Sequence, residues 1–530
     1  MKRDIILTSV LIAASTLIIG CSNNGSDDIY SHKYRAVQID KGDSWSIIDG
    51  EGNIIVKGEY SADDQVSNIY GETYWVKSGD KFQLFSISSP KKPLTADEWD
   101  FATEMFDDRA LVGKVGEPIS IINGSGKIIS TLGKDIAKAS RDIGDGGNIL
   151  IKKSDGTSGW ADENGKIIKD NLYDVTLGKG DIAAIAHKKK DSDKYTIFDS
   201  KGNETGEFTA DYIVALRDGY IGIHKSEKGK LINKNGEMVL ESKKYIAITP
   251  PYFGNCIVVN EDSKFGIMNL EGEELIRAKY KLILPSREDL FIAVKEEGKT
   301  GVINFEDETV IDFEYGDALN VGGNFLMQDG STYILLGRDG KRIGKQEFYS
   351  YSKSPCVKEI SYVNVEELET SILSMVAKFD PNKTIANVAT ELGKKPSGDF
   401  AYTDHFSDAK TMAGQVATIY YTFWTTSLAR EKFHEKTTND GWFDHTEQVS
   451  DGWVWMESNM SGITIIFPTI DNDINQTIEL IASRLKQKGY DNEGYENHPN
   501  MIKDNHHIEI TQYGNGIQAV IGIWEPDPGC

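Results

Sequence analysis

The chain has 530 residues, which is enough for two or three domains. Hydrophobic residues make up 39% of the sequence and charged residues 26%, which excludes global disorder, and four cysteines are too few for a disulfide-built scaffold. Asp and Glu number 82 against 58 Lys and Arg, and the formal net charge of −24 argues against binding nucleic acid or anionic lipid through the general surface.

Residues 1–20 are expected to be a lipoprotein signal peptide. Lys2 and Arg3 precede a mostly apolar stretch at 5–19, which is shorter than the roughly 20 residues of a membrane-spanning helix. The stretch ends in Ile18-Ile19-Gly20-Cys21, which resembles the lipobox of bacterial lipoproteins. The resemblance implies that Cys21 is acylated, becomes the first residue of the mature chain and anchors it in a lipid bilayer. The alternative is an ordinary secretory signal with an incidental cysteine.

Residues 21–33 are expected to form a flexible tether, because residues 22–28 are small and polar. An acidic run directly after the lipid-bearing cysteine resembles the export signal of surface lipoproteins in some Gram-negative lineages. The alternative is a spacer that faces the periplasm. We therefore expect the protein in the cell envelope, at the outer membrane and in one alternative at the cell surface. No later stretch approaches 18 uninterrupted apolar residues, so no other membrane crossing is expected.

A repeat of about 36 residues fills the middle of the chain. Each unit has a few apolar residues, then Asp or Asn, two further residues and Gly. The fourth turn positions are Gly52, Gly126, Gly165, Gly202, Gly236, Gly272, Asp307 and Gly340. From residue 126 onward these marks lie 33 to 39 residues apart, and the gap of 74 between the first two predicts a degenerate unit near residues 82–89.

The repeated signature is typical of a β-hairpin turn. Asp or Asn accepts hydrogen bonds from nearby backbone N–H groups, and Gly adopts the positive φ that the fourth position requires. An aromatic residue follows most marks by 8 to 10 residues, at Tyr60, Tyr173, Tyr212, Tyr245, Tyr280, Tyr315 and Phe348. A further apolar strand precedes the next unit, so each unit offers up to four short strands.

Residues 34–350 resemble the WG-repeat family, whose units begin with Trp-Gly before the apolar residues and the turn. Trp survives at Trp45, Gly survives at Gly159, Gly266 and Gly301, and Tyr195 and Phe265 replace the Trp with other aromatics. Four strands in about 36 residues fit the blade of a β-propeller, and radial stacking hides strand edges. We predict a mainly β protein with a β-propeller of seven to nine blades; the alternative is an open β-solenoid.

Residues 360–530 are predicted to form a separate α+β domain. Asn364 and Glu367 can cap a helix whose apolar residues share one face, and Asp473 and Gln476 can cap another. A short helix at 385–392 is predicted to end at Gly393. Strands are predicted at 416–424, 453–457, 463–467, 507–513 and 517–524.

The candidate ligand-binding residues are tryptophans of this last domain. Exposed aromatic side chains can stack on sugar rings or hold a peptide. Trp424, Trp442, Trp453 and Trp455 are the candidates, and Trp453 and Trp455 share a face if their segment is a strand. The alternative is that these side chains fill the core beneath the helices.

The sequence contains no catalytic motif that fits its context. A G-x-S-x-G elbow is absent, and Cys256, Cys356 and Cys530 stand outside any nucleophile motif. One carboxylate per turn is too few for calcium, which takes about six to eight oxygens. No catalytic residue, metal or cofactor is expected.

The leading functional prediction is a non-enzymatic envelope lipoprotein, anchored through Cys21, whose repeats form a platform that binds protein or glycan. The alternative is a hydrolase-type enzyme with its site in the C-terminal α+β domain. A third interpretation is a scaffold for assembly. Nucleic acid is not an expected partner.

Overall fold

The computed structural model describes residues 33–141, 146–287, 289–413, 415–439, 444–468, 470, 473–495 and 498–523. Cys21 and the residues predicted to form a signal peptide, 1–20, therefore lie outside the described residues. The chain divides into two units, one holding everything up to residue 360 except 115–117, the other holding 115–117 and residues from 361 onward. No helix among the described residues is long and apolar enough to cross a membrane.

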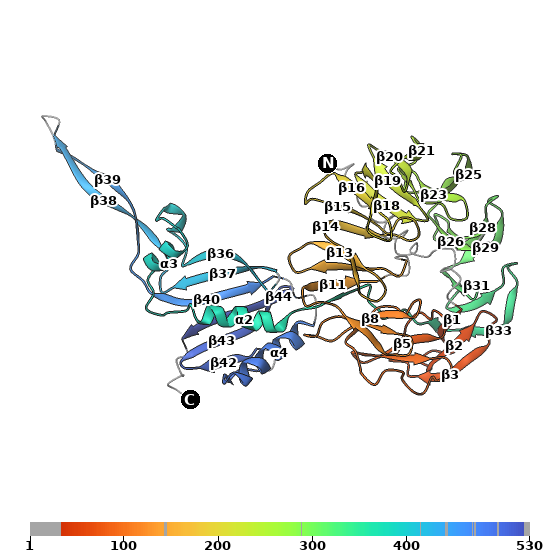
Figure 1. The fold of residues 1–530 in the computed structure, drawn as a ribbon, viewed down its shortest axis with the longest axis horizontal. Coiled ribbons are helices and arrows are strands. Elements are labelled where there is room, and N and C mark those ends of the chain that lie inside the picture. The colour runs from red at the N-terminus through yellow and green to blue at the C-terminus, as the bar shows by residue number, and fades with distance from the viewer. Residues whose placement is uncertain are drawn as a thin grey trace. The chain divides into compact units, whose positions relative to one another are not determined.

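The first unit is a ring of nine blades, counted over the described residues, of which blades 4 and 5 belong to one eight-stranded sheet because they share β14 (Ile167–Leu177). The outermost strands, such as β3 (Ile54–Tyr60) and β33 (Arg342–Phe348), face away from the centre of the ring (Figure 1). From the innermost strand outward, blade 1 consists of β34 (Ser350–Tyr351), β1 (Tyr34–Gln38), β2 (Trp45–Asp49) and β3 (Ile54–Tyr60). Blade 2 consists of β4 (Gln65–Val66), β5 (Thr73–Ser78) and β6 (Lys81–Ser86). Blade 3 consists of β7 (Phe101–Ala102), β8 (Arg109–Gly113), β9 (Ser120–Asn123) and β10 (Ile128–Thr131). Blade 4 consists of β11 (Ile136–Ser140), β12 (Ile149–Lys153), β13 (Ser158–Ala161) and the first half of β14 (Ile167–Leu177). Blade 5 consists of the second half of β14, β15 (Ala184–His187), β16 (Lys194–Phe198) and β17 (Glu204–Thr209). Blade 6 consists of β18 (Tyr212–Arg217), β19 (Tyr220–Lys225), β20 (Lys228–Asn233) and β21 (Met238–Ser242). Blade 7 consists of β22 (Ala247–Ile248), β23 (Asn255–Val259), β24 (Phe265–Asn269) and β25 (Glu274–Tyr280). Blade 8 consists of β26 (Leu282–Arg287), β27 (Leu290–Val294), β28 (Thr300–Asn304) and β29 (Thr309–Tyr315). Blade 9 consists of β30 (Ala318–Val321), β31 (Asn324–Asp329), β32 (Thr332–Leu336) and β33 (Arg342–Phe348). The predicted β-propeller is confirmed, at the upper end of the predicted blade number.

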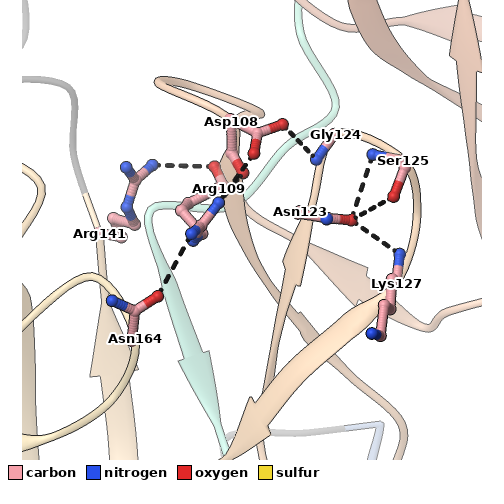
Figure 2. A network of polar contacts seen from close by, with 8 residues as sticks. All are labelled: Asp108, Arg109, Asn123, Gly124, Ser125, Lys127, Arg141 and Asn164. Atoms are coloured by element: carbon pink, nitrogen blue, oxygen red, sulfur yellow. Dashed lines mark hydrogen bonds and ion pairs between the residues drawn. The ribbon is translucent and has the colours of Figure 1, made fainter.

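The repeated signature forms the turn between the third and fourth strands of a blade. In blade 3 the Asn123 side chain accepts hydrogen bonds from the backbone N–H groups of Ser125 (3.2 Å) and Lys127 (2.9 Å), as Figure 2 shows. Gly126 has a φ of +79°, and a Cβ there would lie 2.8 Å from the backbone oxygen of Leu94 in the preceding blade. The turn glycine is therefore required both by the backbone conformation and by the close approach of the neighbouring blade.

The glycine that follows the aromatic position of the repeat, Gly266 in blade 7, is required because the fourth strand bulges across it. In blade 7, Phe265 pairs with Tyr280, but the next pair is Ile267 with Ile276, so the outer strand has extra residues at this point. A Cβ on Gly266 would lie 2.5 Å from the backbone oxygen of Ile276. The same register shift explains the recurrent aromatic, because Tyr280 ends its strand directly opposite the residue at the Trp position.

Neighbouring blades are joined by apolar clusters. Between blades 7 and 8 the fully buried side chains include Ile257, Ile267, Phe291 and Ile303, with Tyr280 almost fully buried. Each such side chain contributes roughly 1.5–3 kcal/mol when it leaves water. A blade alone would expose this surface, so the blades depend on one another.

The ring closes where blade 9 packs on blade 1. Val37 and Ile48 of blade 1 share a buried cluster with Phe348 of blade 9, and the innermost strand of blade 1 comes from the end of the ring. Gln38 pairs with Ser350, whose hydroxyl donates to the Gln38 side-chain oxygen at 2.8 Å. The two ends of the repeat array are therefore held together by both packing and strand pairing.

The segment after β34 continues along the inner strands of the ring. The Ser352 hydroxyl accepts a hydrogen bond from the backbone of Val66 in blade 2 (3.0 Å), and Val357 N–H donates to Ala102 in blade 3 (3.0 Å). β35 (Glu359–Ser361) then pairs beside β11 of blade 4. This segment, residues 352–361, is called the inner strap below.

The degenerate unit predicted near residues 82–89 is blade 2. It has three regular strands, and Trp99 supplies a partial fourth by exchanging backbone hydrogen bonds with Phe82 at 2.8 and 3.1 Å. The loop that precedes Trp99 replaces the usual outer strand, which explains why the repeat signature is missing from the sequence there.

The second unit is an α+β domain built on a seven-stranded antiparallel sheet. Its strands in spatial order are β36 (His405–Met412), β37 (Gln415–Phe423), β40 (Met460–Phe467), β44 (Gly516–Ile523), β43 (His506–Tyr513), β42 (Asn500–Lys503) and β41 (Asp491–Asn492). The helices are α2 (Val365–Val376), α3 (Ile385–Glu391), the 3-10 helix η1 (Gly398–Phe400) and α4 (Ile474–Gln487). Helices α2 and α4 lie against one face of the sheet (Figure 1).

The predicted helix caps are present. The Asn364 side chain accepts from Glu367 N–H at 3.1 Å, and the Asp473 side chain accepts from Gln476 N–H at 3.0 Å. Gly393 follows α3 with a φ of +65°, as expected for a residue that ends a helix.

A two-stranded hairpin extends from this domain (Figure 1). It consists of β38 (Ala429–Asn439) and β39 (Asp444–Trp455), which pair only with each other among the described residues. The strand predicted at 453–457 is therefore the last part of a much longer strand. Its outer residues are polar on both faces, which hides the alternation that identifies a half-buried strand.

Candidate binding surfaces

The face of the C-terminal sheet opposite the helices carries aromatic and polar side chains. Phe406, Ile419 and Phe423 are buried toward the helices, and by strand alternation His405 and Tyr420 belong to the other face. The rings of His405 and Tyr420 meet edge to face with centroids 5.0 Å apart. This face therefore presents a histidine and a tyrosine side by side.

Trp424 is at one end of this sheet and is 73% exposed. It directly follows β37, and its backbone N–H donates a hydrogen bond to the backbone carbonyl of Asn459 at 3.1 Å. Phe423 N–H donates to the Asp404 carbonyl, which brings the segment containing Tyr402, 96% exposed, beside the end of β37. Two large aromatic side chains are therefore open to solvent on neighbouring segments, which is uncommon for residues of this size.

A contact between a histidine and a carboxylate lies beside these aromatics. His405 Nδ1 is 2.8 Å from an Asp404 carboxylate oxygen, and both side chains are partly exposed. Hydrogen-bonding groups next to exposed rings suit a ligand that presents both hydroxyl or amide groups and apolar faces. We call Tyr402, Asp404, His405 and Trp424 the aromatic edge.

The other candidate tryptophans are placed differently. Trp455 packs against Phe400 and Phe406 at centroid distances of 5.4 and 5.3 Å, next to the apolar core. Trp453 is half-buried, and a Cβ on Gly398 would lie 3.1 Å from its indole ring. No ring contact joins either of them to Trp424 within the described part of the chain. Trp442 lies outside the described residues.

The sequence missed Tyr402 and the Asp404–His405 pair. Tyr402 and Asp404 lie between η1 and β36, in a segment whose sequence shows no helical or strand periodicity, and His405 is the first residue of β36. The only sequence signal for Tyr402 is that an aromatic residue stands in a segment that lacks the apolar periodicity of a helix or a strand.

One face of the propeller is formed by two sets of turns, those between the first and second strands and those between the third and fourth. We call it the turn face. Figure 2 shows it at blades 3 and 4, where Asp108 accepts from Gly124 N–H (2.8 Å) and Arg109 donates to the Asn164 side chain of the next blade (3.2 Å). Arg141, almost fully buried, donates to the Arg109 carbonyl at 2.9 Å.

The contact between blades 3 and 4 recurs around the ring. A residue near the first turn of one blade contacts the third-to-fourth-strand turn of the next blade at Asp181–Lys234 (2.6 Å), Asp289–Arg338 (2.5 Å) and Asn324–Gly50 (2.9 Å). At these four junctions the turn face is therefore stabilised by polar contacts that cross from one blade to the next.

The outer strands begin with exposed aliphatic residues two or three positions after the turn glycine. These residues, between 37 and 51% exposed, are Ile54, Ile55, Ile128, Ile129, Ile167, Met238, Val239 and Leu275. They occur in blades 1, 3, 4, 6 and 7, so the rim of the ring next to the turn face is apolar on five blades.

The thiols within the described residues are poor nucleophiles. Burial raises the pKa of the Cys256 thiol to about 12, and burial with the nearby Glu104 carboxylate raises the pKa of Cys356 well above its ordinary value. Burial also raises the pKa of Glu104 to about 7, although Ser354 and Asn68 donate hydrogen bonds to it. Glu104 and Cys356 lie where the inner strap meets blades 2 and 3, and Cys530 lies outside the described residues.

No family model matches the chain, and no curated protein is significantly similar to it. Similar solved structures include one titled as the eukaryotic initiation factor, with 10% identity over 60% of this chain and 96% of that one and a TM-score of 0.41. BamB from Moraxella catarrhalis matches with 11% identity over 52% of this chain and 91% of its own, with a TM-score of 0.32. The C-terminal WD40 domain of Sif2 matches with 11% identity over 43% and 78%, with a TM-score of 0.30. At these identities and TM-scores the matches carry no statement about partners.

Proposed function

We propose that this protein is a lipid-anchored component of a bacterial cell envelope that binds a protein or glycan partner. Its repeats resemble those of the WG-repeat family, and the residues around Cys21 resemble a lipobox. Acylated Cys21 anchors the chain at the outer membrane, the tether at residues 21–33 gives it reach, and the propeller precedes the binding domain along the chain.

The observation that carries this proposal is the exposure of Trp424 and Tyr402 at the aromatic edge. Burying a large aromatic side chain on binding removes about 150–250 Å² of surface from water, which makes such residues the main contributors to many interfaces. Sugar rings and the side chains of a protein both offer the flat apolar faces that an exposed indole contacts. The Asp404–His405 pair supplies hydrogen bonds at the same place.

The binding role is tested by replacing Trp424 and Tyr402 with alanine. The double variant is compared with wild type for retention of proteins and labelled glycans from an envelope extract and on a glycan array. Tyr495→Ala is the matched control, because Tyr495 is an exposed tyrosine elsewhere in the same domain. We expect the double variant to lose at least tenfold in affinity while the control retains it.

Equal retention by all three proteins would refute the role of the aromatic edge. Cleavage of a retained glycan, rather than its stable binding, would instead support the hydrolase alternative.

The anchor is tested separately with Cys21→Ser. The wild-type protein is expected to incorporate a labelled fatty acid and to sediment with outer membranes, whereas the variant is expected to do neither. A wild-type protein that takes up no label would remove lipid anchoring from the proposal and leave the binding role standing.

A further inference from the structure

A pocket of about 340 Å³ lies between blades 4 and 5, on the face opposite the turn face. Its walls come from β11, β12 and β14 and from the turn between β15 and β16. This volume is at the lower end of those found for small-molecule sites. The pocket belongs entirely to the propeller, and no contact of the aromatic edge is involved in it.

The pocket is lined by charges of both signs. Lys138 is neutralised by Glu359 of the inner strap, with the nitrogen 3.2 Å from the carboxylate oxygen. Lys152 of β12 and Lys190 of the turn between β15 and β16 also line it, as do Asp174 of β14 and Asp191, which follows Lys190 in the same turn. Two positive and two negative groups therefore remain beyond the Lys138–Glu359 pair.

These four remaining charges form no ion pair or side-chain hydrogen bond within the described residues. Their neighbours behave differently: Lys153, next to Lys152 in sequence, pairs with Asp170 at 2.5 Å. Asp174 and Asp191 are held at left-handed φ values of +48° and +58°, which fixes their backbone in a conformation that most residues avoid. The pocket thus keeps opposite charges near one another but unpaired.

We propose that this pocket binds a small zwitterion, a free amino acid or short peptide with an ammonium group and a carboxylate. Lys152 and Lys190 would face the carboxylate, and Asp174 and Asp191 the ammonium group. A ligand with only one sign of charge meets as many repelling as attracting groups, whereas a zwitterion satisfies both sets. Leu150 and Val175 supply apolar wall for a side chain.

The affinity is expected to be modest. The charged groups are largely solvent-exposed, and exposed ion pairs are weak because water and salt screen them. We expect a dissociation constant of roughly 0.1–1 mM that rises with ionic strength.

The test titrates the full chain with L-alanyl-L-alanine, its N-acetyl form and its C-terminal amide, followed by calorimetry or ligand-observed NMR. The free dipeptide is expected to bind at least tenfold more tightly than either blocked form. A Lys152→Gln/Lys190→Gln variant should lose this preference over the amide, and an Asp174→Asn/Asp191→Asn variant should lose the preference over the acetylated form. Lys201→Gln, an exposed lysine in a blade 5 turn on the other face, is the control and should bind as wild type.

Equal binding of the three peptides, no binding of the free dipeptide at 20 mM of ligand (about twenty times the weakest expected dissociation constant), or unchanged preference in both double variants would overturn the proposal. The urea midpoint of each variant is measured in parallel, and an unchanged midpoint assigns a loss of binding to the pocket. The aromatic edge is intact in all these variants, so failure here leaves the proposed function untouched.

Discussion

Replacing Gly266 with alanine tests why a glycine is needed after the aromatic position of the repeat, which is Phe265 in blade 7. The new Cβ would lie 2.5 Å from the Ile276 oxygen and 2.7 Å from the Ala278 nitrogen, both backbone atoms that cannot rotate away. The clash is relieved only if the fourth strand, β25, moves away. This movement breaks the backbone hydrogen bonds between β25 and β24 and disturbs the apolar cluster that contains Phe265 and Tyr280. Overpacking of this kind typically costs about 1–3 kcal/mol, and we expect the upper end, about 3 kcal/mol, because backbone must shift.

The assay is urea unfolding followed by tryptophan fluorescence and circular dichroism. Gly133→Ala is the matched control, because its Cβ would meet only the Asp135 carboxylate, the free end of a flexible side chain, and Gly133 has no positive φ. The control should change stability by less than about 0.5 kcal/mol. If Gly266→Ala were as stable as Gly133→Ala, the bulge would not be the reason for the glycine.

Other replacements test the core and the buried charges. Phe348→Ala, at the packing between blades 9 and 1, should lower the free energy of unfolding by about 3–5 kcal/mol in urea titrations, and a loss below 1 kcal/mol would contradict a tight closure. Glu369→Ala removes the buried carboxylate that Arg484 and Lys488 contact at 2.8 Å, and should cost about 2 kcal/mol, because both cations stay partly solvated. Thermal melting of the C-terminal domain measures this effect, and an unchanged melting temperature would speak against it. The pKa of Glu104 rises from 4.5 to about 7 on folding, so the unfolded chain ionises first and stability should fall as pH rises from about 4.5 through 7. Glu104→Gln should remove this part of the pH dependence of the urea midpoint, and identical pH profiles would refute it.

The propeller could be predicted from the sequence because each blade repeats the same local chemistry. The turn at Asn123 and the bulge at Gly266 depend on Asn and Gly, which are residue types with few other structural roles. The closure could not be predicted, because β34 is two residues long and has no period. Its partner β1 lies more than 300 residues away, so only tertiary packing fixes the pair.

The C-terminal domain was predictable where helices have caps and apolar stripes, as at Asn364 and Asp473. The long hairpin was not, because solvent on both faces removes the alternation that marks a strand. The exposure of Trp424 was equally hidden: β37 is apolar or aromatic at many positions, and its sequence does not say which of them face the helices.

Nine blades form a ring that is closed by the pairing of β34 with β1. This closure is tested most directly by the variant Gln38→Cys/Ser350→Cys, since these residues are cross-strand partners and such pairs have the spacing of a disulfide. A closed ring predicts a disulfide between positions 38 and 350 after mild oxidation, found by peptide mapping, to the same extent as in the within-blade control Lys230→Cys/Glu241→Cys. A control pair that links while 38 and 350 stay reduced would contradict the closed ring.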